Sequence, residues 1–293
     1  MSNILFSIII PTYNRANLIG KTIASILKQT YTNFEIIVVD DGSSDNTEEV
    51  IGAIKDDRLT YYKKENAERG AARNYGAYLA KGDYINFFDS DDIAYQNHLQ
   101  TALQVIKTNN QPEVFALHYE IKNTSNKIIR TGTIFKNINQ QIIDGNLLSC
   151  NGVFVKKEIA LKHPFSELRE LSASEDYLLW LQLAANYSFF HSNIKTSVII
   201  EHDMRSVLSI KKDGLIKRKE LMLKIALEDK DINKSFFNQI NRLKTNTYSY
   251  ISLHLAMANY KKDSFNYLIK SIKTSPSLIF KKRFFAIIKN LIA

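Results

Sequence analysis

Three carboxylates crowd into four positions of the segment INFFDSDD, residues 85–92, directly after an apolar run. Asp89, Asp91 and Asp92 repel one another when ionised, so their crowding calls for a compensating charge. Mg²⁺ and Mn²⁺ prefer hard oxygen ligands, and magnesium typically takes one or two carboxylates together with water and substrate phosphates. The segment therefore indicates a site for a divalent cation and a diphosphate, and a solvated turn that caps a following helix is the alternative.

A second acidic segment, VVDDGSSDNT at residues 38–47, places Asp40 at the end of another apolar run. A carboxylate at the end of such a strand can accept hydrogen bonds from a nucleotide base or a ribose hydroxyl. Helix capping and turn formation are the alternative, and the sequence predicts that role for Ser43, Ser44 and Asp45.

A third acidic pair, Glu175 and Asp176, stands at the predicted start of a helix in SASEDYLLW, after the candidate caps Ser172 and Ser174. Acidic side chains favour helix N-termini because of the helix dipole. Helix stabilisation therefore explains the position of this pair at least as well as a catalytic role does.

Buried strands must position these acids. The runs SIIIP (7–11) and FEIIVVDD (34–41) are short and rich in β-branched residues, with a helical apolar pattern between them, so they predict a β-α-β unit. DYINFF (83–88) predicts a further strand. Ligands bind at the carboxyl ends of the strands in open α/β sheets, so PTYNR, DDGSSD and the first acidic segment should face one crevice.

The rest of the chain divides into shorter elements. Residues 94–107 predict a helix capped by the acidic segment, 113–155 predict short strands, and the strand TSVIIE precedes His202. Beyond about residue 210, apolar residues recur at helical spacing among lysines. The length of 293 residues, 45% of them hydrophobic, suits one large domain or a domain with an extension.

Composition also bounds the cellular setting. Cys150 is the single cysteine, which excludes an internal disulfide and a cysteine-based zinc site and fits a reducing compartment such as the cytosol. The apolar N-terminus lacks a basic leader and a cleavage site. No stretch approaches the roughly 20 apolar residues that span a bilayer, so an integral membrane protein is not expected.

Four motifs, SIIIPTYNR, IIVVDDGSSDNT, ENAERGAARNYGAYLAKGDYINFFDSDD and SEDYLLWLQLA, occur in the order and approximate spacing of the family 2 glycosyltransferases. The chain resembles this family over roughly residues 4–205. The resemblance implies a GT-A type, Rossmann-like α/β/α sandwich at 1–210, with a nucleotide-sugar half at about 1–110 and an acceptor half at about 111–210. A basic helical C-terminal region, 211–293, follows.

The resemblance also implies an activity. The protein would be an inverting glycosyltransferase of the hexosyltransferase type, acting with Mg²⁺ or Mn²⁺ in the assembly of bacterial surface polysaccharide or glycolipid. Its donor would be a nucleotide-diphospho-sugar, most commonly a UDP-sugar, and its acceptor a carbohydrate or a lipid-linked sugar. The residues that would bind the donor are Pro11, Thr12, Tyr13, Arg15, Asp40, Arg73, Asp89 and Ser90.

Within this implied site, Asp91 would ligate the metal, Asp89 would approach the ribose or a metal-bound water, and Asp92 would cap the next helix. His202 stands where many relatives carry a histidine that contacts the metal or the diphosphate, and a structural role is its alternative. Arg73, expected on a helix near Asp41, has an alternative as well, a structural ion pair. Arg205 and Ser206 would contact phosphate from the loop that follows.

The resemblance assigns Asp176 as the general base and gives Glu175 the task of orienting the acceptor or its loop. This fits a single displacement, in which an acceptor hydroxyl attacks the anomeric carbon opposite the diphosphate and a carboxylate takes its proton. The metal would stabilise the departing charge.

Charge is distributed unevenly. The net charge is +9, and residues 211–293 hold 18 Lys and Arg against 6 Asp and Glu. The last segment, SPSLIFKKRFFAIIKNLIA, predicts an amphipathic helix that either contacts anionic lipid at the inner face of the membrane or packs on its own domain.

Two other classes of protein are alternatives to a glycosyltransferase. A dinucleotide oxidoreductase would need a G-x-G-x-x-G turn, and no glycine follows the first strand until Gly20. A basic membrane- or nucleic-acid-binding protein with a non-catalytic nucleotide-sugar fold is the second alternative, although no nucleic-acid-binding motif is present and nucleic acid is not expected as a partner.

Overall fold

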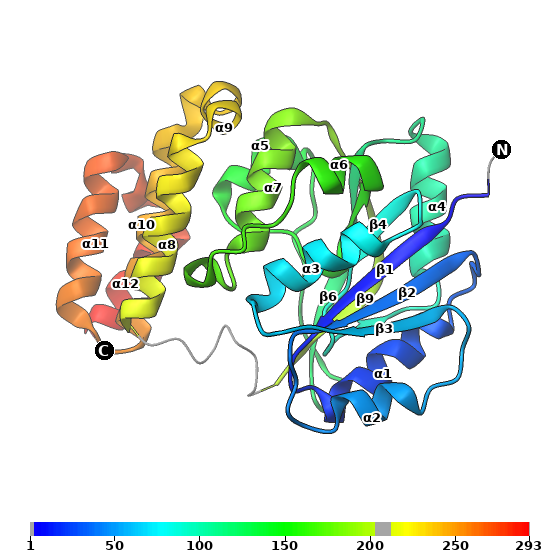
Figure 1. The fold of residues 1–293 in the computed structure, drawn as a ribbon. Coiled ribbons are helices and arrows are strands. Elements are labelled where there is room, and N and C mark those ends of the chain that lie inside the picture. Colours follow the sequence, from blue (N-terminus) through cyan, green and yellow to red (C-terminus); the bar gives the residue numbers. More distant parts are fainter. Residues whose placement is uncertain (1–2, 203–211, 293) are drawn as a thin grey trace.

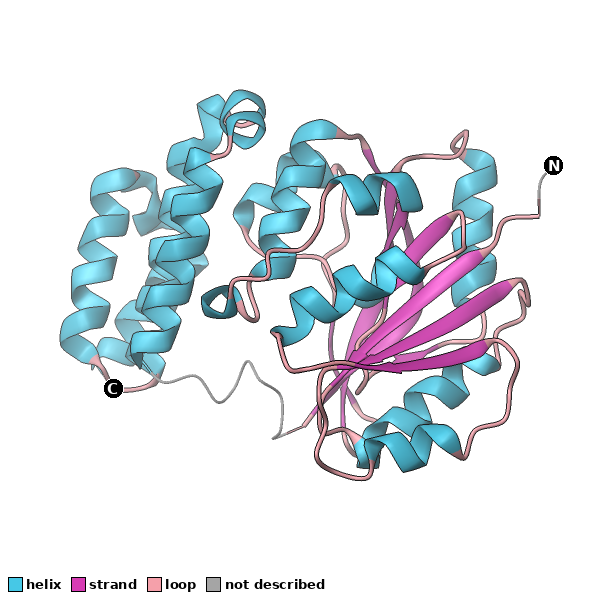
Figure 2. Ribbon diagram, viewed as in Figure 1, coloured by secondary structure: helices cyan, strands magenta, loops and turns pink. Residues whose placement is uncertain are grey.

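The computed structural model describes residues 3–202 and 212–292, as a mixed α/β body with a helical bundle beside it (Figure 1). Arg205 and Ser206, predicted to contact phosphate, lie outside the described residues. Figure 2 shows the strands gathered in the middle of the body and helices around them.

Within the described residues the strands form one nine-stranded sheet in the order β3-β2-β1-β4-β8-β6-β9-β5, and β7 pairs with β6. The strands are β1 Phe6–Thr12, β2 Phe34–Asp40, β3 Leu59–Lys63, β4 Tyr84–Phe87, β5 Ile93–Ala94, β6 Val114–Asn123, β7 Ile128–Thr131, β8 Val153–Lys156 and β9 Phe189–Glu201. The strands β3, β2, β1 and β4 run parallel, and β8 is antiparallel to β4. The predicted strands 7–11, 34–41 and 83–88 therefore lie side by side, as expected.

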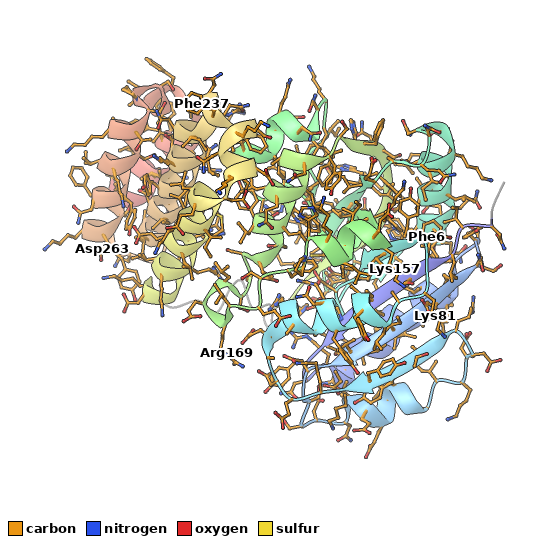
Figure 3. All side chains as sticks on the ribbon, turned by 45° about the horizontal axis from the view of Figure 1, so that its top comes forward. Phe6, Lys81, Lys157, Arg169, Phe237 and Asp263 are labelled. Carbon is orange, nitrogen blue, oxygen red and sulfur yellow. The ribbon has the colours of Figure 1, made fainter. Side chains whose placement is uncertain are left out.

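Helices cover both faces of the sheet because buried residues of a strand point alternately to either side. Ile8 and Ile10 pack in one core with α1 (Ala16–Leu27), α2 (Thr47–Gly52) and α4 (His98–Thr108). Ile9 packs in a second core with α3 (Glu68–Leu79) and α7 (Glu175–Asn186). This is the α/β/α sandwich that the sequence predicted, and Figure 3 shows side chains filling the space between its layers.

One boundary was predicted incorrectly. The helix expected from residue 94 begins at His98, after the N-cap residue Asn97. Ile93 and Ala94 instead form β5, which pairs with Val198 and Ser197 of β9. A two-residue edge strand carries no periodic pattern, so only its distant partner reveals it.

The remaining helices are short in the second half of the sandwich and longer at the end of the chain. They are α5 Ile138–Gln141, α6 Lys157–Lys162, α8 Lys212–Glu228, α9 Lys230–Ser235, α10 Ile240–Met257, α11 Lys261–Thr274 and α12 Lys282–Ile292. The helical character predicted beyond residue 210 is confirmed for the described part, 212–292. In this part of the chain and in 3–202, no helix combines the length and the apolar character that crossing a bilayer requires.

The C-terminal helices share a core with the sandwich. Met222 and Ala226 of α8 and Leu243 of α10 belong to the same buried cluster as Trp180 of α7. Ile287 of α12 is buried against Leu268 and Leu278, and Phe284, Ile288 and Leu291 pack around them. One side of the last helix therefore packs on its own bundle, whereas Phe280, at the preceding turn, is 80% exposed.

Candidate active site

Loops from three parallel strands meet at one edge of the sheet. The backbone N–H of Asp41 donates to the carbonyl of Thr12 at 2.8 Å, which joins the ends of β2 and β1. The Asn14 N–H donates to Ser43 Oγ at 2.8 Å, and the Phe88 N–H donates to the Ile9 carbonyl at 2.8 Å. The predicted crevice edge is thus built by hydrogen bonds between the segments that carry the motifs.

Asn151 holds the acidic segment in place. Its Oδ1 accepts from the Asp89 N–H at 2.8 Å, and its Nδ2 donates to Asp92 Oδ2 at 2.7 Å. Asp92 Oδ1 accepts from the Ile200 N–H at 2.9 Å, and the side chain is fully buried. The prediction that Asp92 caps the next helix is therefore wrong: it ties the acidic segment to a 3₁₀ turn (Cys150–Gly152) and to β9.

Asp91 and His202 form the pair that could hold a metal. Asp91 Oδ2 lies 3.1 Å from His202 Nε2 and 3.7 Å from Arg15 Nε. Two neighbouring ligands of an octahedral cation, each about 2.1 Å from it, are about 3 Å apart, so the separation of Asp91 Oδ2 and His202 Nε2 matches that of two adjacent metal ligands. No cluster of three or more His, Cys, Asp or Glu ligands occurs in the described ranges. The pair matches a cation that takes its other ligands from water and phosphate.

Arg73 connects the acidic segment to the third acidic pair. Its Nη2 donates to Asp89 Oδ1 and its Nη1 to Glu175 Oε1, each at 2.8 Å. The guanidinium is buried, whereas Asp89 reaches the cavity described below. Arg73 therefore forms a structural ion pair, which was the alternative role, with Asp89 and Glu175. Asp41 pairs instead with Lys64 Nζ at 2.7 Å.

Glu175 and Asp176 point to different partners. Both begin α7, as the sequence predicted. Glu175 is buried and binds Arg73 and the Ser174 N–H. Asp176 Oδ2 accepts from Asn146 Nδ2 at 2.8 Å, and its Oδ1 from the Tyr177 N–H at 2.7 Å. Burial and the neighbouring charge of Glu175 raise the pKa of Asp176 above its ordinary value, as suits a carboxylate that must take up a proton.

These groups open onto a cavity of about 330 Å³ that the sequence did not predict in full. Asp89, Glu175 and Asp176 line it, and Lys219, Tyr250 and Arg283 from the C-terminal helices belong to the lining as well. The only signal for the second group was the basic excess of residues 211–293, which indicates an anionic partner without naming residues.

The predicted donor residues fall into two groups. Tyr13 is 48% exposed at the crevice edge, and Arg15 lies beside Asp91. Asp89 is half-buried. The buried group is Pro11, Thr12, Asp40, Arg73 and Ser90. Asp40 accepts from the Ser43 N–H at 2.7 Å and from the Tyr61 hydroxyl at 2.8 Å, so both of its oxygens have protein donors. A contact of Asp40 with a nucleotide base stays a prediction.

The family model named "Glycosyl transferase family 2" matches residues 7–155, which carry the first three motifs and the acidic segment. The chain belongs to glycosyl transferase family 2. An uncharacterized glycosyltransferase of Rickettsia conorii is 34% identical over 185 residues, 62% of this chain. The match covers 30% of that relative, so the chain spans less than a third of its length.

A second relative carries a specific name. It is the Escherichia coli UDP-Glc:alpha-D-GlcNAc-diphosphoundecaprenol beta-1,3-glucosyltransferase WfgD, 35% identical over 62% of this chain and 71% of WfgD.

Solved structures have the same fold. TarS 1–349 of S. aureus in complex with UDP-GlcNAc superposes with a TM-score of 0.70 at 20% identity, over 98% of this chain and 88% of TarS 1–349. The mannosyltransferase PcManGT from Pyrobaculum calidifontis in complex with GDP-Man and Mn²⁺ gives 0.63 at 17% identity, over 98% and 86%. This family 2 chain therefore has the GT-A fold with a helical C-terminal region.

Proposed function

We propose that the protein is an inverting glycosyltransferase, which moves a hexose from a nucleotide-diphospho-sugar to an acceptor hydroxyl. The observation that carries this proposal is the place of Asp176. Among the described residues its carboxylate has neutral hydrogen-bond donors and no ion pair, its pKa is raised, and it lines the cavity that Asp89 also reaches. A carboxylate held in this way can accept the proton of an attacking hydroxyl.

Asp91 and His202 would hold Mg²⁺ or Mn²⁺ together with the phosphates of the donor. A cation bound there would neutralise the charge that develops on the departing diphosphate. Arg15, 3.7 Å from Asp91, adds a fixed positive charge on the same side. The presence of Mn²⁺ and GDP-Man in the PcManGT structure supports this use of a metal.

The buried contacts of Arg73 support an inverting geometry. Arg73 bridges Asp89, two residues before Asp91, and Glu175, next to Asp176. In the proposed mechanism these contacts would connect the base, Asp176, with the metal pair and keep the two apart. A single displacement needs this separation, because the nucleophile attacks from the face opposite the leaving group. Glu175 would position Arg73 and the start of α7.

A UDP-sugar is the proposed donor and a lipid-linked sugar the proposed acceptor, in surface polysaccharide or glycolipid assembly at the inner face of the membrane. The UDP-GlcNAc complex of TarS and the printed name of WfgD support these substrates. Membrane contact would run through the exposed side chains of Phe280 and Phe285, with Lys281 and Lys282 between them.

The test is a panel of UDP- and GDP-sugars with Mn²⁺ and a set of acceptors, followed by nucleotide release and donor binding. Asp91→Asn should weaken metal-dependent donor binding. Asp176→Asn should leave donor binding intact and slow transfer by about 10²- to 10⁴-fold. Asp57→Asn, at an exposed position, is the matched control. Normal transfer by Asp176→Asn would refute the base, and binding of no nucleotide sugar would refute the enzyme.

A further inference from the structure

The C-terminal helices bring two cations to the cavity that holds Asp176: Lys219 of α8 and Arg283 of α12. Lys219 Nζ donates to Ser174 Oγ at 2.9 Å and lies 4.8 Å from the ring centroid of Tyr250. Arg283 Nη1 donates to the carbonyl of Asn246 at 3.2 Å and to a serine hydroxyl of α10 at the same distance. Within residues 3–202 and 212–292, neither cation has a carboxylate at ion-pair distance.

The other charges of this cavity are largely matched by protein partners. Arg73 binds both Asp89 and Glu175, and Asp144 forms an ion pair with Arg242. Among the described residues, the cavity therefore combines three carboxylates that are paired with arginines, and Asp176, which is not, with two cations that have no carboxylate partner and come from α8 and α12.

Holding these cations in the cavity carries an energetic cost. Burial lowers the pKa of Lys219 to about 8 and lowers that of Arg283 below its ordinary value. Both side chains are half-buried, and a charge that has lost part of its water is stabilised by a partner of opposite charge. An anionic ligand in the cavity would supply the missing counter-charge to both side chains.

We infer that Lys219 and Arg283 bind a phosphate group of the acceptor, so that the cavity takes a sugar whose hydroxyl meets Asp176 and whose phosphate meets the helical wall. The assignment of this cavity to the acceptor rests on the proposed function. A lysine point charge and a planar guanidinium together suit a phosphate, which offers several oxygens, better than a single carboxylate. The volume of about 330 Å³ lies within the range of small-ligand sites, about 300–1,000 Å³.

The experiment measures the binding of glucose 1-phosphate, glucose and glucuronic acid to the full chain by calorimetry, without metal or nucleotide. Glucose 1-phosphate should bind at least about 10-fold more tightly than either of the others. Lys219→Gln and Arg283→Gln should each remove most of this preference, and Lys219→Arg should keep it. Lys224→Gln removes an equal charge from an exposed position of α8 and should change nothing. Circular dichroism confirms that each variant is folded.

Affinity for UDP and Mn²⁺ separates the two proposals. Lys219→Gln should leave this affinity within about 2-fold, because the inferred phosphate belongs to the acceptor. A loss of 10-fold or more would place the donor's diphosphate on Lys219 and overturn the inference. Tighter binding of glucuronic acid than of glucose 1-phosphate, or equal binding of all three probes, would overturn it too. Failure of the wild type to bind UDP would instead count against the proposed function and leave the sugar-phosphate result standing on its own.

Discussion

Replacing Arg73 with methionine tests whether this residue holds the site together. The side chain is buried and binds Asp89 and Glu175, each at 2.8 Å. Removing one partner of a buried ion pair typically costs about 3–5 kcal/mol, because the remaining charge is left without compensation. Glu175 is itself buried, and Arg69 Nε stays 4.0 Å from it, so we expect Arg73→Met to lower the free energy of unfolding by about 3 kcal/mol at pH 7, the lower end of this range.

The double variant Arg73→Met/Glu175→Met separates the pair from its surroundings. Replacing both buried charges with apolar side chains of similar size is often close to neutral, so the double variant should recover much of the stability. Arg58→Met is the control, because Arg58 pairs with Asp56 on the surface and such pairs contribute about 0–1 kcal/mol. Urea unfolding followed by circular dichroism gives the free energy of unfolding of the wild type and of the three variants. A cost below about 1 kcal/mol for Arg73→Met, or a double variant no more stable than Arg73→Met, would refute this reasoning.

The same substitution should move the pH profile of transfer. The positive charge of Arg73 opposes burial and Glu175, which raise the pKa of Asp176. Without that charge the pKa of Asp176 rises further, so a higher pH is needed to ionise the base. The acidic limb of kcat against pH should therefore shift upward in Arg73→Met. A downward shift, or none in a folded variant, would contradict the place of Asp176 as the base.

Three further changes test other parts of the structure. Burial lowers the pKa of His98 from 6.5 to about 3, so folding favours the neutral ring. The stability that the neutral ring contributes is fully present above pH 6.5 and falls by about 1.4 kcal/mol per pH unit below it. Between pH 6.5 and pH 5, urea unfolding should therefore show a loss of unfolding free energy that is about 2 kcal/mol larger in the wild type than in His98→Gln. Gly152→Ala would place a Cβ 2.4 Å from a backbone carbonyl oxygen of β6, so it should lower the free energy of unfolding by about 1–3 kcal/mol and slow transfer. Gly52→Ala has open space around its Cβ and should change neither value in the same assays. Phe280→Ser should lower the affinity for anionic vesicles, measured by co-sedimentation, by about 10-fold. Tyr78→Ser, on the surface of the sandwich, should leave it unchanged, and equal effects of the two substitutions would refute membrane contact through the last helices.

The sequence predicted the elements that a local pattern defines. Short β-branched runs and helical spacing gave β1, α1, β2 and β4, and the order of the strands then placed Asp91 at the crevice edge. It did not predict contacts between distant segments. Asp92 binds Asn151, 59 residues away, and Arg73 binds Glu175, 102 residues away. Nothing in the local pattern around Asp92 separates a helix cap from a buried carboxylate with a distant amide partner.

The packing of the C-terminal helices is likewise a contact between distant segments that the local sequence pattern did not predict. The basic charge of residues 211–293 was evident from the sequence, and the last segment left open whether it contacts anionic lipid or packs on its own domain. Met222 and Leu243 instead pack in one core with Trp180 of α7, the helix that begins with Glu175 and Asp176. Deleting residues 212–292 would expose that core and remove the cavity wall that carries Lys219. A truncated chain would therefore lose activity for structural reasons, whatever the role of the membrane. Single substitutions at exposed positions such as Phe280 are the test that keeps the two functions apart.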